Sequence, residues 1–331
     1  MRLLIIFFVM LMYSCNSGSE LIQPINTAND TFFIDGDVEV VFENDRDNGI
    51  NVLFMGDAYL QSDLGQTYGT YRELALENIN ALFETEPFSS YKEHFNAYII
   101  YVVSNEDVIT TTQNDTAFGT TISHTGPNNS PLLFISDYDN LEVYASKVTN
   151  SSLTEKELIL MSINNTNRGT AFLNGNLALF GGGNTSLMIH EVGHAFAGLG
   201  DEYFFDDYLS TYNTTGIPNL DTTNDLNLVK WNHFIELENY NMVNAFEGGG
   251  YNEYGIWRPE DSSIMMEINS SHFFNAPSRE AIVKRIMELR GLPYNFSDFL
   301  EIDQICLLNN RSTQHRKKSE KTFCDAKHSL N

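Results

Sequence analysis

Two histidines and one glutamate stand at a spacing that suits metal binding and the activation of water. The stretch from Ser186 to Leu199 reads SLMIHEVGHAFAGL and contains His190, Glu191 and His194. In a helix, His190 and His194 lie one turn apart on the same side, so their ring nitrogens can bind one ion. Glu191 stands beside them and can take a proton from water on that ion. The spacing therefore predicts an HExxH zinc helix.

The same stretch has the amphipathic pattern of a helix packed against a core. At 100° per residue, an apolar stripe falls on the side opposite the two histidines and the glutamate. The stripe consists of Ile189, Val192, Phe196 and Leu199. Small residues lie between the polar ones and leave space around them: Gly193, Ala197 and Gly198. A surface helix with two ordinary histidines is the alternative.

A catalytic zinc ion needs a third protein ligand, and Asp201 is the candidate just past the helix. Gly198 and Gly200 allow the chain to turn sharply there, which can bring the Asp201 carboxylate back beneath the ion. A carboxylate oxygen binds Zn²⁺ at about 2.0–2.2 Å. Glu202 is the alternative ligand, and Asp201 can also be an ordinary residue of a helix-terminal turn.

Strand and helix patterns alternate along the chain, which is typical of an α/β fold. Apolar runs predict strands at 51–59, 95–104, 131–136 and 158–163. Apolar residues at helical spacing predict a helix over 71–83. A second helix is expected over 278–292, with Ser278 as N-cap and Gly291 at its end.

Composition excludes one broad class of partner. The 331 residues carry a formal net charge of −25, and 42% of them are hydrophobic. Nucleic-acid binding needs clustered Lys and Arg to contact phosphates, so we expect no nucleic-acid partner. The hydrophobic fraction is sufficient for a substantial core.

The first residues indicate export. A short basic start precedes an apolar run from Leu3 to Met12 that is too short to span a bilayer. The run ends in Tyr13-Ser14-Cys15, which resembles a bacterial lipoprotein signal whose cysteine is lipidated. We expect residues 1–14 to be a signal peptide and acyl chains on Cys15 to anchor the protein at the outer membrane or cell surface. An ordinary secretory signal with an incidental Cys15 is the alternative.

The two remaining cysteines, Cys306 and Cys324, both lie in the C-terminal tail at 295–331. In an oxidising compartment they can pair and close a small loop. Neither belongs to a CxxC pattern of the kind that binds metal.

Beyond these local patterns, the chain resembles the IgA-peptidase family of bacterial zinc metallopeptidases. The likeness is carried by HEVGHAFAGLGDEY (190–203), with MGDAY (55–59), Pro87-Phe88, SNE (104–106), DTAF (115–118), Trp231, WRP (257–259) and SIM (263–265). It covers about residues 50–292. Gly198 and Asp201 sit one residue further along than the HExxHxxGxxH spacing of metzincins would place them, and Asp replaces the third His.

The resemblance implies a fold and a division of the chain. The expected fold is a metzincin-like zinc peptidase domain of α/β class, with a mixed β-sheet, an active-site helix and a Met-turn. This catalytic domain is expected at 49–294, after a tether with one or two edge strands at 15–48. Met265 is the expected Met-turn residue and Met266 its rival; both can also be ordinary core methionines.

The resemblance also implies hydrolysis of peptide bonds in extracellular proteins, with one catalytic Zn²⁺. Glu191 acts as general base toward the nucleophilic water on zinc and later protonates the leaving amine. Tyr203 is a candidate to stabilise the oxyanion, together with Tyr208, Tyr254 and His233. The sequence does not rank these four, and each can also be an ordinary structural residue. The family name does not establish IgA as a substrate. The alternative functions are a non-catalytic zinc-containing adhesin or binding lipoprotein, and a zinc amidase acting on cell-wall material.

Overall fold

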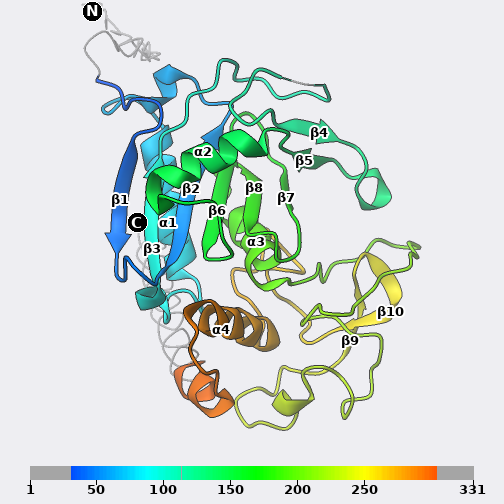
Figure 1. Ribbon diagram of the computed structural model, residues 1–331. Coiled ribbons are helices and arrows are strands. Elements are labelled where there is room, and N and C mark those ends of the chain that lie inside the picture. The colour runs from blue at the N-terminus through cyan, green and yellow to red at the C-terminus, as the bar shows by residue number, and fades with distance from the viewer. Residues whose placement is uncertain (1–30, 113, 304–331) are drawn as a thin grey trace, which may run out of the picture.

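The structure is a computed structural model that describes residues 31–112 and 114–303 (Figure 1). The expected signal peptide and lipidation residue Cys15, and the cysteines Cys306 and Cys324, lie outside the described residues. Within the described part, no helix is both long enough and apolar enough to cross a membrane.

The elements follow one another in a mixed α/β order. The strands are β1 (Val38–Glu43), β2 (Ile50–Asp57), β3 (Phe95–Ile100), β4 (Thr121–Ser123), β5 (Leu132–Phe134), β6 (Glu157–Ile163), β7 (Gly169–Ala171), β8 (Leu177–Gly181), β9 (Phe246–Gly249) and β10 (Asn252–Arg258). The helices are α1 (Tyr71–Glu84), α2 (Tyr138–Thr149), α3 (Thr185–Ala197) and α4 (Ala276–Arg290). A further helix covers 296–303.

Six strands form the central sheet, in the order β1-β3-β2-β6-β8-β7. The four inner strands β3, β2, β6 and β8 are parallel, whereas β1 and β7 pair antiparallel at the two edges. The α/β class and the mixed sheet expected from the sequence are therefore confirmed.

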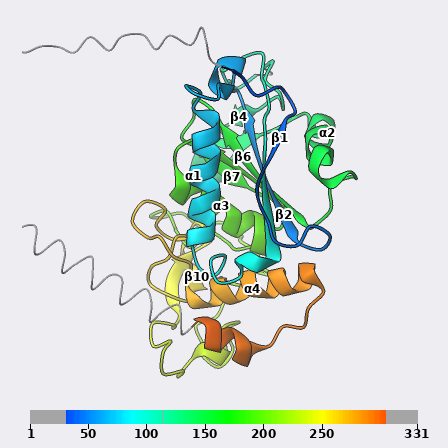
Figure 2. The same ribbon diagram turned by 90° about the vertical axis from the view of Figure 1, so that its left-hand side faces the viewer.

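Helices cover both faces of this sheet, as Figure 2 shows for α1 and α3 on one side and α2 on the other. Strand β2 illustrates why, because its successive side chains alternate between the faces. Val52 and Phe54 belong to the core that includes α1 and α3. Leu53 and Met55 belong to a second core with Leu141 of α2. A strand buried on both faces reads as a continuous apolar run, which is what the sequence shows at 52–55.

The part of the chain after α3 has little regular structure and lies below the sheet in Figure 1, around the β9–β10 hairpin and α4. It is held together by buried apolar side chains and by buried polar contacts. Arg279 of α4 forms a buried ion pair with Asp303, with the guanidinium Nε 2.6 Å from the carboxylate. Phe299 in the last helix is also buried. The described structure thus continues through Asp303 as part of this lower region.

Several element boundaries differ from those expected. Helix α4 begins at Ala276, not after Ser278, because Asn275 is its N-cap and accepts a hydrogen bond from the Ser278 N–H at 3.0 Å. Strand β3 ends at Ile100, not at Ser104. Strands β7 and β8 were not expected at all, although they form the end of the sheet nearest α3. Glycines at 169 and 181 within these short strands obscure their apolar pattern.

Candidate metal centre

Helix α3 holds two histidines and a glutamate inside the protein. Its N-cap Asn184 accepts a hydrogen bond from the Leu187 N–H at 3.0 Å. Gly198 ends the helix in the left-handed conformation, with φ +61°. Every residue from Leu187 to Phe196 is buried, because the helix packs against the sheet on one side and α4 on another. The polar face predicted from the sequence therefore lies in the interior.

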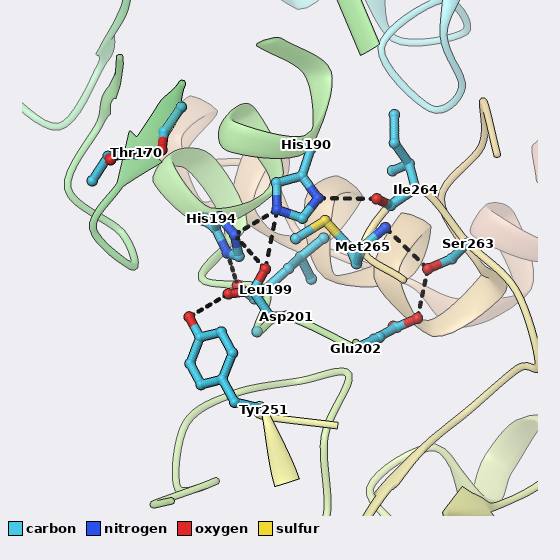
Figure 3. Close-up of polar contacts among 12 residues, drawn as sticks. Thr170, His190, His194, Leu199, Asp201, Glu202, Tyr251, Ser263, Ile264 and Met265 are labelled. Carbon is cyan, nitrogen blue, oxygen red and sulfur yellow. Dashed lines mark hydrogen bonds and ion pairs between the residues drawn. The ribbon is translucent and has the colours of Figure 1, made fainter. Parts of the chain in front are cut away.

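Backbone carbonyls orient both imidazole rings. The Nδ1 of His190 lies 2.9 Å from the carbonyl oxygen of Ile264, and the Nδ1 of His194 lies 2.5 Å from that of Leu199 (Figure 3). A carbonyl can only accept, so each Nδ1 carries the proton and donates it. When a ring is neutral, its Nε2 therefore has the lone pair. These two Nε2 atoms face each other at 3.1 Å.

The Asp201 carboxylate completes the cluster. Its Oδ1 lies 3.0 Å from the His190 Nε2 and 3.2 Å from the His194 Nε2. All three residues are buried, and their ligand atoms lie within 4.8 Å of one another. The one-residue displacement of Asp201 from the metzincin spacing thus does not keep its carboxylate away from the histidines.

This arrangement has the chemistry of a cation site. Three atoms that bear lone pairs converge in a buried place, and Oδ1 of Asp201 receives no hydrogen bond from the described residues. Burying such polar atoms without a hydrogen-bond partner or a bound ion costs free energy. The separations of 3.0–3.2 Å are close to the roughly 3.3 Å expected between tetrahedral ligands at zinc distances. His190, His194 and Asp201 therefore fit a metal ion.

Protons compete for the same atoms in the metal-free protein. Burial acts to lower the pKa of His194, but the Asp201 carboxylate outweighs burial and raises this pKa to about 9. The two histidines in turn hold the pKa of Asp201 below its ordinary value, against the opposing effect of burial. Binding of a metal here must release a proton.

Glu202 faces away from this cluster, although it follows Asp201 directly. Its carboxylate is fully buried and accepts three hydrogen bonds, from Asn219 at 2.8 Å, Asn275 at 2.6 Å and Ser263 at 2.5 Å. It connects the segment of Asp201 to three other segments. The sequence left both Asp201 and Glu202 as candidates for the third ligand, and in the structure it is Asp201 that faces the histidines.

Glu191 lies beside the cluster with its carboxylate free of hydrogen bonds from the described residues. The side chain is buried, and burial raises its pKa to about 7; the two histidines oppose this shift and Asp201 adds to it. Gly169 of β7 leaves room for the carboxylate, since a Cβ at this position would overlap its Oε1. Such a group can exchange a proton near neutral pH.

A turn at 264–266 contacts the centre. Its Ile264 carbonyl is the one that orients His190, and its Met265 carbonyl accepts a hydrogen bond from the Glu202 N–H at 2.9 Å. Met265 is fully buried, and its sulfur would lie 2.8 Å from a Cβ added at Gly193 in α3. The turn with Met265 is thus packed directly against α3.

Of the residues considered for oxyanion binding, Tyr203 packs beside a histidine of the cluster. Its ring is 6.4 Å from that of His190, at an interplanar angle of 27°. Burial raises the pKa of Tyr203 well above its ordinary value, so its hydroxyl remains a donor.

The other three candidates have different surroundings. His233 binds Glu280 at 2.9 Å and packs against Phe296 in the lower region. Tyr208 packs against Phe205, and Tyr254 is 58% exposed on β10. None of these contacts involves the ligand cluster.

Three residues at the centre were not identified from the sequence. Tyr251 donates its hydroxyl hydrogen to Oδ2 of Asp201 (Figure 3), Gly169 faces Glu191, and Asn219 supports Glu202. All three are distant in sequence from the residues they contact. The one local signal that could have drawn attention to Tyr251 is the neighbouring run of glycines at 248–250, which indicates a turn.

Comparison with known proteins identifies one family. A family model described as IgA Peptidase M64 matches residues 38–241. The match includes the central sheet, α3 and Asp201, and it ends before Tyr251 and Met265. No curated protein matches the chain.

Proposed function

This chain belongs to the IgA peptidase M64 family, and from that premise we propose that it is a zinc-dependent endopeptidase acting on extracellular proteins. One observation carries the proposal: the Nε2 atoms of His190 and His194 and an oxygen of Asp201 converge in a buried cluster, with the Glu191 carboxylate beside them. Membership of a peptidase family supplies the type of reaction.

The ligand set favours zinc in a catalytic role. Two imidazole nitrogens and one carboxylate oxygen suit Zn²⁺, and catalytic zinc sites have three protein ligands and an open position. Structural zinc sites are usually closed by four protein ligands. Among the described residues, no fourth His, Cys, Asp or Glu joins this cluster. This argues against the adhesin with a purely structural zinc.

When bound, the zinc ion supplies Lewis acidity toward the scissile carbonyl and lowers the pKa of a water molecule. Glu191 accepts the proton of the attacking water and passes it to the leaving amine. Its pKa of about 7 in the metal-free site is suited to both steps. His190 and His194 stay fixed during the reaction because the carbonyls of Ile264 and Leu199 orient their rings.

Two further roles complete the proposal. Tyr203, next to His190, donates a hydrogen bond to the oxyanion of the tetrahedral intermediate. Met265 serves as the Met-turn residue, a role supported by its burial and by its packing near Gly193. The hydroxyl of Tyr203 can act in this way because it stays protonated.

The substrate is proposed to bind as an extended peptide. Strand β7 is an edge strand of the sheet, and its Gly169 borders Glu191. An edge strand presents backbone groups to which an extended chain can add.

The protein is further proposed to work at the cell surface, anchored by lipid on Cys15. The support is the sequence pattern of residues 1–15. Mass spectrometry of the protein purified from membranes tests this directly. A diacylglycerol-type mass increase on a peptide that starts at Cys15 is expected, and a mature N-terminus elsewhere contradicts the anchor.

The peptidase proposal is tested by comparing the wild type with Glu191→Gln, using casein and immunoglobulins as substrates and measuring zinc content in parallel. The wild type should bind one zinc and cleave protein, whereas the variant should keep the zinc and lose activity by about 10²–10⁴-fold, the usual contribution of a general base. Glu238→Gln, at an exposed position in the lower region, is the matched control. The peptidase proposal fails if the wild type binds zinc but cleaves no protein that the Glu191→Gln variant leaves intact. Chelator-sensitive release of a small amine from peptidoglycan would instead favour the amidase.

A further inference from the structure

The two oxygens of the Asp201 carboxylate have different partners. Oδ1 faces the Nε2 atoms of both histidines, at 3.0 and 3.2 Å. Oδ2 accepts a hydrogen bond from the hydroxyl of Tyr251, on the turn between β9 and β10 (Figure 3). Tyr251 therefore occupies the oxygen that the histidines do not face.

The backbone of Tyr251 is coupled to the segment that carries Asp201. Tyr251 has φ +68°, in the left-handed region that a bulky side chain rarely adopts. Backbone hydrogen bonds hold it there: the Tyr251 N–H donates to the carbonyl of Tyr203 and the Phe205 N–H to the carbonyl of Tyr251, both at 3.1 Å. The neighbouring Gly250 N–H donates to the carbonyl of Asp201 at 2.8 Å. The positions of Tyr251 and Asp201 are thus set together.

Aromatic rings pack around the ring of Tyr251. The Tyr251 ring stacks on Phe205 at 6.1 Å and 10°, and it meets Tyr203 at 5.5 Å and Tyr212 at 5.9 Å, both edge to face. These rings restrict the rotation of Tyr251, whose hydrogen bond to Asp201 is partly buried. A hydrogen bond to an ionised carboxylate is stronger in such surroundings.

We propose that Tyr251 restricts Asp201 to binding metal through Oδ1 alone and thereby selects Zn²⁺ over larger ions that prefer oxygen. Zinc is satisfied by four ligands in tetrahedral geometry. Mn²⁺ and Ca²⁺ prefer oxygen ligands and higher coordination, and carboxylates often supply Ca²⁺ with both oxygens. A carboxylate whose second oxygen is already bonded cannot readily offer it. Tyr251 is therefore a positioning residue for metal selectivity.

This inference rests on the proposed role of Asp201 as a metal ligand but not on peptidase activity. The test is accordingly a binding measurement on the full chain. Metal-free wild type, Tyr251→Phe and Tyr254→Phe are titrated with Zn²⁺ and Mn²⁺ in competition with a chromogenic chelator. Tyr254 is an exposed tyrosine on the same hairpin, so its variant is the matched control.

In Tyr251→Phe, the Zn²⁺ dissociation constant should rise by about 10–100-fold, the usual effect of losing a partner of a metal ligand. The Mn²⁺ constant should rise much less, so that the preference for zinc falls at least tenfold. Tyr254→Phe should leave both constants unchanged. If the dissociation constants of both metals rise by the same factor in Tyr251→Phe, Tyr251 affects only the general shape of the site, and the selectivity proposal is wrong. Unchanged constants overturn it as well.

A second measurement needs no variant and is decisive even if Tyr251→Phe does not fold. A crystal structure of the zinc-loaded wild type should show Oδ1 of Asp201 on the ion and Oδ2 on the Tyr251 hydroxyl. Oδ2 on the ion would overturn the proposal. A protein that binds zinc in this way but cleaves no protein would contradict the peptidase function and leave the role of Tyr251 standing.

Discussion

Gly169 of β7 lies against the Glu191 carboxylate of α3, so closely that a Cβ on Gly169 would overlap Oε1. The same Cβ would also approach Leu187 Cδ1 at 2.8 Å. The β7 edge of the sheet and helix α3 thus meet at the side chain proposed as the general base. The absence of a side chain at 169 sets where that carboxylate can lie.

Gly169→Ala should consequently lower kcat while leaving the metal bound. The added methyl group displaces the Glu191 carboxylate, and a displacement of about 1 Å near the reacting atoms can cost roughly 10²-fold in rate. The measurement is kcat on a peptide substrate together with zinc content. An unchanged kcat would show that the position of Glu191 is not critical.

The pH dependence of hydrolysis should follow the ionisation of Glu191. Burial raises its pKa to about 7, and only the ionised carboxylate can accept the proton of water. Activity should therefore fall as pH decreases, with an acid limb in kcat/KM at or below about 7, because a bound cation favours the charged form. If kcat/KM instead increases as the pH is lowered below 5, this assignment of Glu191 is wrong.

Asp201→Asn should greatly weaken metal binding without unfolding the protein. The amide keeps the shape of the side chain but removes the negative charge that faces the two histidines. We expect zinc affinity to fall by about 10²-fold or more, beyond the 10–100-fold effect typical of residues behind the ligands. Competition with a chelator measures this, and Asp206→Asn at an exposed neighbouring position is the control. Equal affinities in the two variants would exclude Asp201 as a ligand.

Glu202→Ala should reduce stability more than a surface change does. It leaves the buried donors of Asn219, Asn275 and Ser263 without their acceptor, and each such loss costs about 1–3 kcal/mol. We expect a loss of about 3–5 kcal/mol in the free energy of unfolding, measured by urea denaturation of the metal-free protein. Glu238→Ala, which is exposed, should stay within about 0.5 kcal/mol of the wild type. If Glu202→Ala changes the free energy of unfolding as little as Glu238→Ala does, the donors of Asn219, Asn275 and Ser263 must find other acceptors.

The short-range features of this protein could be read from the sequence because their cause is local. A helix repeats every 3.6 residues, so the spacing of His190 and His194 already places both rings on one side. Buried strands such as β2 and β6 appear as apolar runs, and their alternation with helices predicts the α/β class. The left-handed Gly198 that ends α3 also follows from a residue preference.

The tertiary structure decided what depends on contacts between distant segments. Asp201 and Glu202 have neighbouring positions and similar chemistry, and sequence spacing cannot tell which one faces the histidines. The choice is made by Asn219, Asn275 and Ser263, which bind Glu202, and by Tyr251, which binds Asp201. These partners come together only when the chain has folded. Contacts made through loops and side-chain packing follow no fixed period in the sequence, so no sequence pattern predicts them.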